Sequence, residues 1–345
     1  MIELAGLPAS HIGRRQLLFS AVAIVVGAAA TRAGAQDRRY RIAFANLNDD
    51  PAVRVEGLGF TGAEIRRSFE LAVRTLPVDL IYYDNGGDGQ KALANADDAI
   101  SRKVDLLIEY NADAEANAEI ARKMHAAGIR VLALTYPVPG APLYTADNLV
   151  AGRIAGKALG EFAKQTWQDE TVIAVVVGDL GDPGTAVADR VRGIEDGLGQ
   201  ELPDVAPARI DTSGNPVRTE GLLTKFLLAQ TKRKILVAAL DDATALAAKG
   251  TITLAGRIND CVIAGLGLDR SVHGGTSEKK EIDPNNRGSI VLGSVAFYLD
   301  RYGYDVLPIA LSMLRGEPVP PRTVTQHVFV SGKNVFAIYP PYDMN

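Results

Sequence analysis

The chain has 345 residues, of which 47% are hydrophobic and 23% are charged, a balance typical of a globular protein with more than one lobe. Its net charge of −4 argues against the basic surface that binds nucleic acid. Because Cys261 is the one cysteine, disulfides within the chain and cysteine-based zinc clusters are excluded.

Residues 1–35 have the pattern of a cleaved export signal. Arg14-Arg15 precede an apolar run that is too short to span a bilayer comfortably, and Ala33-Gly34-Ala35 offers the small residues of a cleavage site. The arginine pair favours twin-arginine export, and an ordinary export signal that happens to contain two arginines is the alternative. We expect a periplasmic protein that begins near Gln36, without a lipid anchor because no cysteine stands near the cleavage site.

The mature part alternates between strands and helices, which predicts an α/β fold with parallel sheets. Strands are expected at 40–45, 78–84, 104–110, 131–134, 171–177, 208–211, 235–240, 261–266, 288–295 and 323–330. Helices are expected over 65–76, 90–103, 114–127, 151–165, 186–198, 219–229 and 298–314, and a further helix is expected to begin at 241. The same alternation occurs in both halves, so two similar lobes with a cleft between them are the natural architecture.

The stretch from Val104 to Pro137 shows this pattern most clearly. The continuous apolar run Leu106–Ile108 indicates a strand buried on both faces, and Gly128 ends the helix that follows. Ligands of such sheets bind beyond the carboxyl ends of the strands, where Asn111 and Thr135-Tyr136 stand.

The order of motifs resembles the type I periplasmic sugar-binding proteins, the ribose- and galactose-binding family. The resemblance covers the whole mature chain and rests on Ile42–Pro51, on Val104–Ile108 with Ala126–Val131, on Asp147-Asn148 before Gly152–Gly156, on Gly184-Thr185 with Arg190–Gly193, and on Asp241–Ala247. It implies two Rossmann-like lobes joined by a three-strand hinge. The first lobe would comprise 36–147 plus 294–322, and the second 148–293 plus 323–345.

The carboxyl ends of the strands and the resemblance together indicate a set of ligand-binding residues. On the first lobe these are Asn48, Asp50, Asn111, Thr135 and Tyr136, and on the second Arg192, Asp241 and Asp269. Two features depart from the family pattern. Ala52-Val53 stand where two aromatic residues usually sandwich a sugar ring, and Thr135-Tyr136 replace an Asp-Arg pair. The resemblance therefore leaves the ligand open among a polyol, a modified sugar and a small acid.

Several of these residues have a second interpretation. Asp50 and Asp241 are equally suited to turn and helix-capping roles. Arg192 would bind a carboxylate or diol, or else pair with Asp189 or Asp196 on the helix surface. The segment 53–62 could reach over the cleft with Glu56 and Phe60, but we favour a surface loop.

The function expected from this reading is capture of a small polar solute by lobe closure and its delivery to the permease of an ABC importer. A sensory binder that presents its ligand to a histidine kinase or chemoreceptor is the alternative. We expect a monomer that touches membrane proteins only peripherally and uses no cofactor. The histidines are far apart and no acid–base constellation or metal-ligand spacing is visible, so we expect neither an enzyme nor a metal site.

Overall fold

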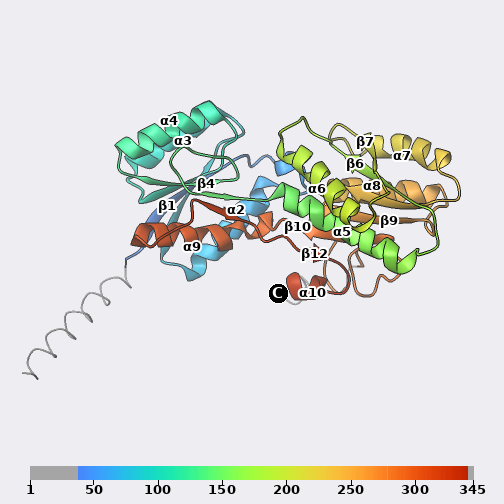
Figure 1. The fold of residues 1–345 in the computed structure, drawn as a ribbon. Helices are drawn as coiled ribbons and strands as arrows, with labels where there is room; N and C mark the ends of the chain where they lie inside the picture. The colour runs from blue at the N-terminus through green and yellow to red at the C-terminus, as the bar shows by residue number, and fades with distance from the viewer. Residues whose placement is uncertain (1–37, 278, 341–345) are drawn as a thin grey trace, which may run out of the picture.

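The computed structural model describes residues 38–277 and 279–340. The predicted export signal lies outside the described residues. The described chain forms two six-stranded sheets, each covered by helices on both faces, and Figure 1 shows the two resulting lobes side by side. This confirms the predicted α/β class with two parallel-sheet lobes. Within the described residues, no helix is both long and apolar enough to cross a membrane.

The first lobe is built on a fully parallel sheet with the strand order β11-β5-β4-β3-β1-β2. Its strands are β1 (Tyr40–Asn46), β2 (Val78–Asp84), β3 (Leu106–Glu109), β4 (Arg130–Leu134), β5 (Leu143–Thr145) and β11 (Arg322–Val324). Its helices are α2 (Gly62–Ala72), α3 (Gly89–Ser101), α4 (Ala114–Ala126) and α9 (Tyr302–Arg315), with the short turns η1 (Val55–Gly57), η2 (Val73–Thr75) and η3 (Leu299–Arg301). Successive β1 residues alternate between two cores, as a strand buried on both faces requires.

The second lobe has the order β12-β10-β9-β8-β6-β7, with the last strand antiparallel. Its strands are β6 (Val172–Gly178), β7 (Ala208–Asp211), β8 (Lys234–Ala239), β9 (Cys261–Gly267), β10 (Val291–Ala296) and β12 (Phe329–Val330). Its helices are α5 (Asn148–Thr166), α6 (Ala186–Glu201), α7 (Arg218–Ala229), α8 (Asp242–Leu254) and α10 (Val335–Ile338). The single strand expected at 323–330 is wrong, because the chain passes from the first sheet into the second within it.

Helices α5 and α6 touch backbone to backbone because glycines line their contact. A Cβ atom on Gly152 or Gly156 of α5 would lie 2.1 Å from a carbonyl oxygen of α6, and one on Gly193 or Gly197 of α6 would lie 2.1 Å from a carbonyl oxygen of α5. Glycine at these four positions therefore fixes the two helices at close range. Side chains at their N-terminal ends are brought together as a result.

Three crossovers connect the lobes, and one buried histidine joins all of them. His327, on the third crossover, accepts a hydrogen bond at Nε2 from the backbone N–H of Asp147 (3.1 Å) on the first. Its Nδ1 lies 2.9 Å from the carbonyl oxygen of Ala296 at the second, so a neutral ring with the proton on Nδ1 satisfies both contacts. The sheets place Ser294 to Ala296 in the second lobe and Arg322 to Val324 in the first.

We predict that His327 makes stability fall in acid. Burial lowers the pKa of His327 below the ordinary 6.5. As pH falls below 6.5, the unfolded chain therefore binds a proton at this residue that the folded protein does not bind, and the folded protein loses stability. Replacement by Phe should remove about 1–2 kcal/mol at pH 7.5 through two lost hydrogen bonds and should lessen the further loss at pH 5. Thermal unfolding of His327→Phe at both pH values checks this, with His125→Phe on the exposed side of α4 as control. An acid loss as large in His327→Phe as in wild type would contradict it.

Glu109 is a second buried titratable group, below the helices α3 and α4. Its Oε1 accepts a hydrogen bond from Asn85 (2.9 Å), while Oε2 has no hydrogen-bond partner among the described residues. Burial raises the pKa of Glu109 to about 8. The folded protein therefore keeps a proton that the unfolded chain releases from about pH 4.5 upward.

We predict that this carboxyl makes the protein less stable as pH rises towards 8. Each pH unit within the window costs up to about 1.4 kcal/mol, so the free energy of unfolding should drop by roughly 2–3 kcal/mol between pH 5.5 and 8.5. Glu109→Gln mimics the protonated acid and should flatten this dependence in urea unfolding. Glu115→Gln, at an exposed position on α4, is the matched control. Equal slopes for wild type and Glu109→Gln would rule the idea out.

Candidate functional site

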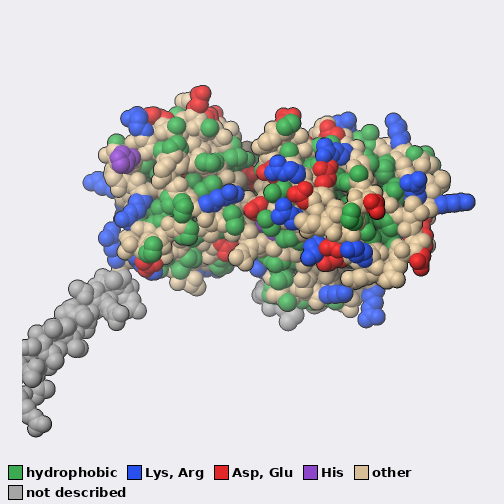
Figure 2. Space-filling model, in the orientation of Figure 1, with side chains coloured by type: hydrophobic (Ala, Val, Ile, Leu, Met, Phe, Trp, Pro, Cys, Tyr) green, Lys and Arg blue, Asp and Glu red, His purple; other side chains and the backbone are tan. Residues whose placement is uncertain are grey.

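The residues between the lobes enclose a small cavity at the carboxyl ends of the first-lobe strands. Its volume is about 150 Å³, and Figure 2 shows the narrower waist at which the two lobes meet. Both lobes and the crossovers contribute to its walls. The lining residues are Glu56, Thr135, Tyr136, Thr145, Ala146, Asn148, Ala186, Arg190, Phe297, Leu299 and Tyr302.

Arg190 is the second lobe's charged contribution to this cavity, and it is almost wholly buried. Its Nε donates to Asn148 Oδ1 at 2.6 Å, an arrangement that the close contact of α5 and α6 makes possible. Its Nη2 donates to the carbonyl oxygen of Glu56 at 2.6 Å, and its Nη1 to that of Gly57 at 3.4 Å. The guanidinium also lies 5.1 Å from the centre of the Phe297 ring. Burial lowers the pKa of Arg190, but its ordinary value is so high that it stays charged.

Glu56 is the first lobe's charged contribution. Its Oε1 accepts a hydrogen bond from the Tyr110 hydroxyl at 2.6 Å, and its Oε2 a longer one from the Tyr136 hydroxyl at 3.4 Å. Burial raises the pKa of the Glu56 carboxyl, which the Tyr110 hydrogen bond and the Arg190 charge only partly counteract. An acid, a guanidinium and two phenols thus converge on one point of the cleft.

Thr135 contributes an unsatisfied polar atom. Its backbone is left-handed, with φ 65°, a rare and strained conformation for a β-branched residue. Within the described part of the chain its buried hydroxyl makes no hydrogen bond of normal geometry, and the Tyr302 hydroxyl is the polar group near it. Strain and a buried unpaired hydroxyl at the same cavity wall are typical of a position shaped to meet a ligand.

The structure brings four of the eight predicted residues to the cleft. Thr135 and Tyr136 line the cavity. Asp241 lies close enough to Arg190 for their charges to interact, and its side chain also caps α8 through Thr244. Asp269 is buried directly against Gly59, where a Cβ atom would lie 1.4 Å from its Oδ2. Ligand contact by these four residues stays a prediction.

The other four predicted residues are engaged elsewhere. Asn48 and Asp50 hold a turn, in which Asn48 accepts from the Asp50 N–H and Asp50 accepts from the Ala52 N–H, each at 2.8 Å. Asn111 is buried and bonded to Asn117 at 3.0 Å. Arg192 is exposed and paired with Asp189 at 2.9 Å. None of the four lines the cavity.

Arg190 takes the place in the cleft where we had expected Arg192. The helical period shows why: Arg190 precedes Gly193 and Ile194 by three and four residues and shares their buried face, whereas Arg192 points outward. That spacing would have identified Arg190 from the sequence. Asn148, Phe297, Leu299 and Tyr302 carry no comparable signal, because they come together only through the crossovers.

The segment 53–62, which we expected to be a surface loop, instead lies between the lobes with its larger apolar side chains buried, and we call it the cleft hairpin. Val55, Leu58 and Phe60 are at most 2% exposed and belong to a core cluster that also contains residues of both lobes. The Val55 N–H bonds to the Phe60 carbonyl (2.9 Å), and the Leu58 N–H to the Val55 carbonyl (3.0 Å). In Figure 1 it is the blue stretch that reaches the second lobe.

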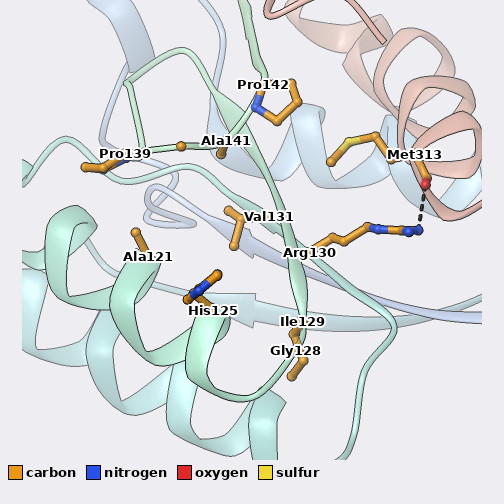
Figure 3. Close-up of a pocket in the computed structure, with 11 residues that line it drawn as sticks. Ala121, His125, Gly128, Ile129, Arg130, Val131, Pro139, Ala141, Pro142 and Met313 are labelled. Atoms are coloured by element: carbon orange, nitrogen blue, oxygen red, sulfur yellow. Dashed lines mark hydrogen bonds between the residues drawn. The ribbon is translucent and has the colours of Figure 1, made fainter. Parts of the chain in front are cut away.

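A second cavity lies on the outside of the first lobe and lacks the features of a binding site. It has a volume of about 440 Å³ and opens beside His125, Arg130 and Pro142, at the amino end of β4. Figure 3 shows Arg130 turned towards α9, where it donates to the Met313 carbonyl at 2.6 Å. Ligands of parallel sheets bind at the opposite, carboxyl ends of the strands. Within residues 38–277 and 279–340, no group of three His, Cys, Asp or Glu side chains is placed to hold a metal ion.

We predict that Arg190→Ala destabilises the protein. The substitution removes the positive charge near the Glu56 carboxyl, and it leaves the backbone carbonyls of Glu56 and Gly57 without their hydrogen-bond donor. The expected loss is about 3 kcal/mol in the free energy of unfolding, measured by urea titration. Arg192→Ala, two residues away on the same helix, should change it by less than about 0.5 kcal/mol. Equal effects of the two substitutions would contradict this assignment.

Comparison with known proteins gives one family and many similar structures. No curated protein sequence matches the chain. An ABC transporter solute-binding protein from Mycobacterium smegmatis with bound glycerol is 20% identical, with a TM-score of 0.64. The match covers 87% of this chain and 96% of the Mycobacterium smegmatis chain. One from Actinobacillus succinogenes with bound D-allose is 16% identical, covering 86% and 99%, with a TM-score of 0.65. The fructose-binding periplasmic domain of a hybrid two-component system is 21% identical, covering 87% and 93%, with a TM-score of 0.59.

These likenesses establish the fold, and the sequence profile of one family establishes the membership. The profile is described as a periplasmic binding protein domain, and it matches residues 59–317. With its two parallel-sheet lobes, the chain belongs to the periplasmic binding protein family in its type I form, a family of solute-binding proteins and not of enzymes.

Proposed function

We propose that this protein captures a small polyhydroxylated solute in the periplasm and delivers it to an ABC importer. The observation that carries the proposal is the convergence of groups from both lobes on one small cavity. Glu56, Thr135 and Tyr136 come from the first lobe, and Arg190 and Asn148 from the second. Only contacts that involve both lobes favour the closed state over the open one.

The chemistry of the cavity supports a polyol or sugar-like ligand. Carboxylate, amide and hydroxyl groups can exchange hydrogen bonds with ligand hydroxyls. The rings of Tyr136, Phe297 and Tyr302 offer apolar faces to the carbon skeleton. The ligands of similar proteins, glycerol, D-allose and fructose, belong to this chemical class.

A sensory role is the second candidate, and one observation favours it. The similar fructose-binding domain belongs to a two-component system rather than to an importer. Both roles use the same lobe closure and differ in the partner protein that recognises the closed form. The closed, ligand-loaded protein should stimulate ATP hydrolysis by an importer in the first case and autophosphorylation of a kinase in the second.

We predict that the purified protein binds a polyol or sugar and is stabilised by it. A ligand at one hundred times its Kd adds about 2.7 kcal/mol to the free energy of unfolding, which raises the Tm by several degrees. A thermal-shift screen over polyols, sugars and small acids measures this. Thr135→Val, which removes the unpaired hydroxyl and keeps the shape, should weaken binding about tenfold, and Thr253→Val on the exposed end of α8 should not. A screen in which only small acids bind would refute the ligand class.

A further inference from the structure

The cleft hairpin occupies space that a ligand would otherwise have. It leaves the first lobe after β1 and enters the cleft, where Val55, Leu58 and Phe60 join a core cluster shared by both lobes. Leu58 reaches the second sheet, since its Cδ2 lies 3.7 Å from the position of a Cβ on Gly267. The apolar side chains of the hairpin thus connect the hydrophobic core of the first lobe with that of the second.

Three kinds of contact hold the hairpin in that position. Arg190 of the second lobe donates to the carbonyls of Glu56 and Gly57. The Glu56 side chain is held from the first lobe by Tyr110. The backbone of Gly59 lies so close to Asp269 that a methyl group on it would overlap the carboxylate.

The turn at the tip of the hairpin is conformationally costly. Glu56 and Gly57 both have left-handed backbones, with φ of 59° and 61°, which together form a turn of type I′. Asn or Gly normally occupies the first of these positions, and glutamate there is strained. The side-chain and backbone contacts of Glu56 therefore specify this turn, and the strain indicates a position kept for a role in the cleft.

The space that remains is small. A cavity of about 150 Å³ is the size that accommodates a molecule as large as benzene. Glycerol, which has as many non-hydrogen atoms as benzene, fits such a space, whereas a hexose has twice as many. Cavities that enclose larger ligands usually measure about 300 Å³ or more.

We propose that the cleft hairpin is a specificity element that restricts the solute to a polyol of about the size of glycerol and excludes hexoses. The inference rests on the proposed function of the same cavity. It goes beyond that function because it assigns the size limit to one segment, residues 53–62. The hydroxyls of Thr135 and Tyr136 and the Glu56 carboxylate meet the polyol's hydroxyls, while the Phe297 and Tyr302 rings close the space around its carbons.

Gly59→Ala tests the proposal because its methyl group would overlap Asp269 and push the hairpin out of the cleft. Arg54→Ala, at an exposed position of the same hairpin, is the matched control. Isothermal titration of the purified proteins with glycerol and D-allose gives the affinities. We expect wild type and Arg54→Ala to bind glycerol at least tenfold more tightly than D-allose. We expect Gly59→Ala to gain at least tenfold in affinity for D-allose.

A second measurement needs no ligand and keeps the two hypotheses apart. Hydrogen exchange of the Val55 and Leu58 amides, both bonded within the hairpin, should be slow in ligand-free wild type and at least tenfold faster in Gly59→Ala. Slow exchange with no binding of any solute would refute the proposed function and leave the hairpin as an occupant of the cleft. Wild type that binds D-allose as tightly as Gly59→Ala does, or amides that exchange at the unprotected rate, would overturn the inference.

Discussion

A single buried guanidinium determines how the two lobes of this protein meet. Arg190 is buried at the cleft, and moving such a charge out of water is costly unless its donors are satisfied. Its Nε is bonded within the second lobe to Asn148, and its two other nitrogens to carbonyls of the first lobe's hairpin. The lobes can separate only if those carbonyls and the guanidinium find water in exchange. Opening and hydration of the cleft are therefore one process.

The position of that charge follows from the packing of two helices. The glycines of α5 and α6 remove the side chains that would keep the helices apart. Arg190 then stands beside Asn148 at the N-terminal ends of both helices. A larger residue at Gly152 would meet the carbonyl oxygen of Arg190 itself, so the helix contact and the cleft contact are mechanically coupled. The geometry of the cavity depends on a contact that no ligand touches.

The fold could be predicted from the sequence because strands such as Leu106–Ile108 are continuous apolar runs and helices such as Ala114–Ala126 have a clear apolar face. The cavity could be predicted only in part. Thr135 and Tyr136 were found because the carboxyl end of a parallel strand is a known location. Arg190 was missed in favour of Arg192, although the helical period distinguishes them. The cleft hairpin could not be predicted, because its burial depends on contacts with residues far away in the sequence, such as Arg190 and Asp269.

The way the last crossover divides its strands limits how the lobes can move. Strand β11 ends at Val324 in the first sheet and β12 begins at Phe329 in the second, so four residues separate them. Four fully extended residues span at most about 14 Å, and His327 ties this short connection to the other two crossovers. The lobes cannot slide apart, and any opening must be a rotation about an axis through the three crossovers. Its widest gap would lie on the side of the cleft farthest from that imidazole.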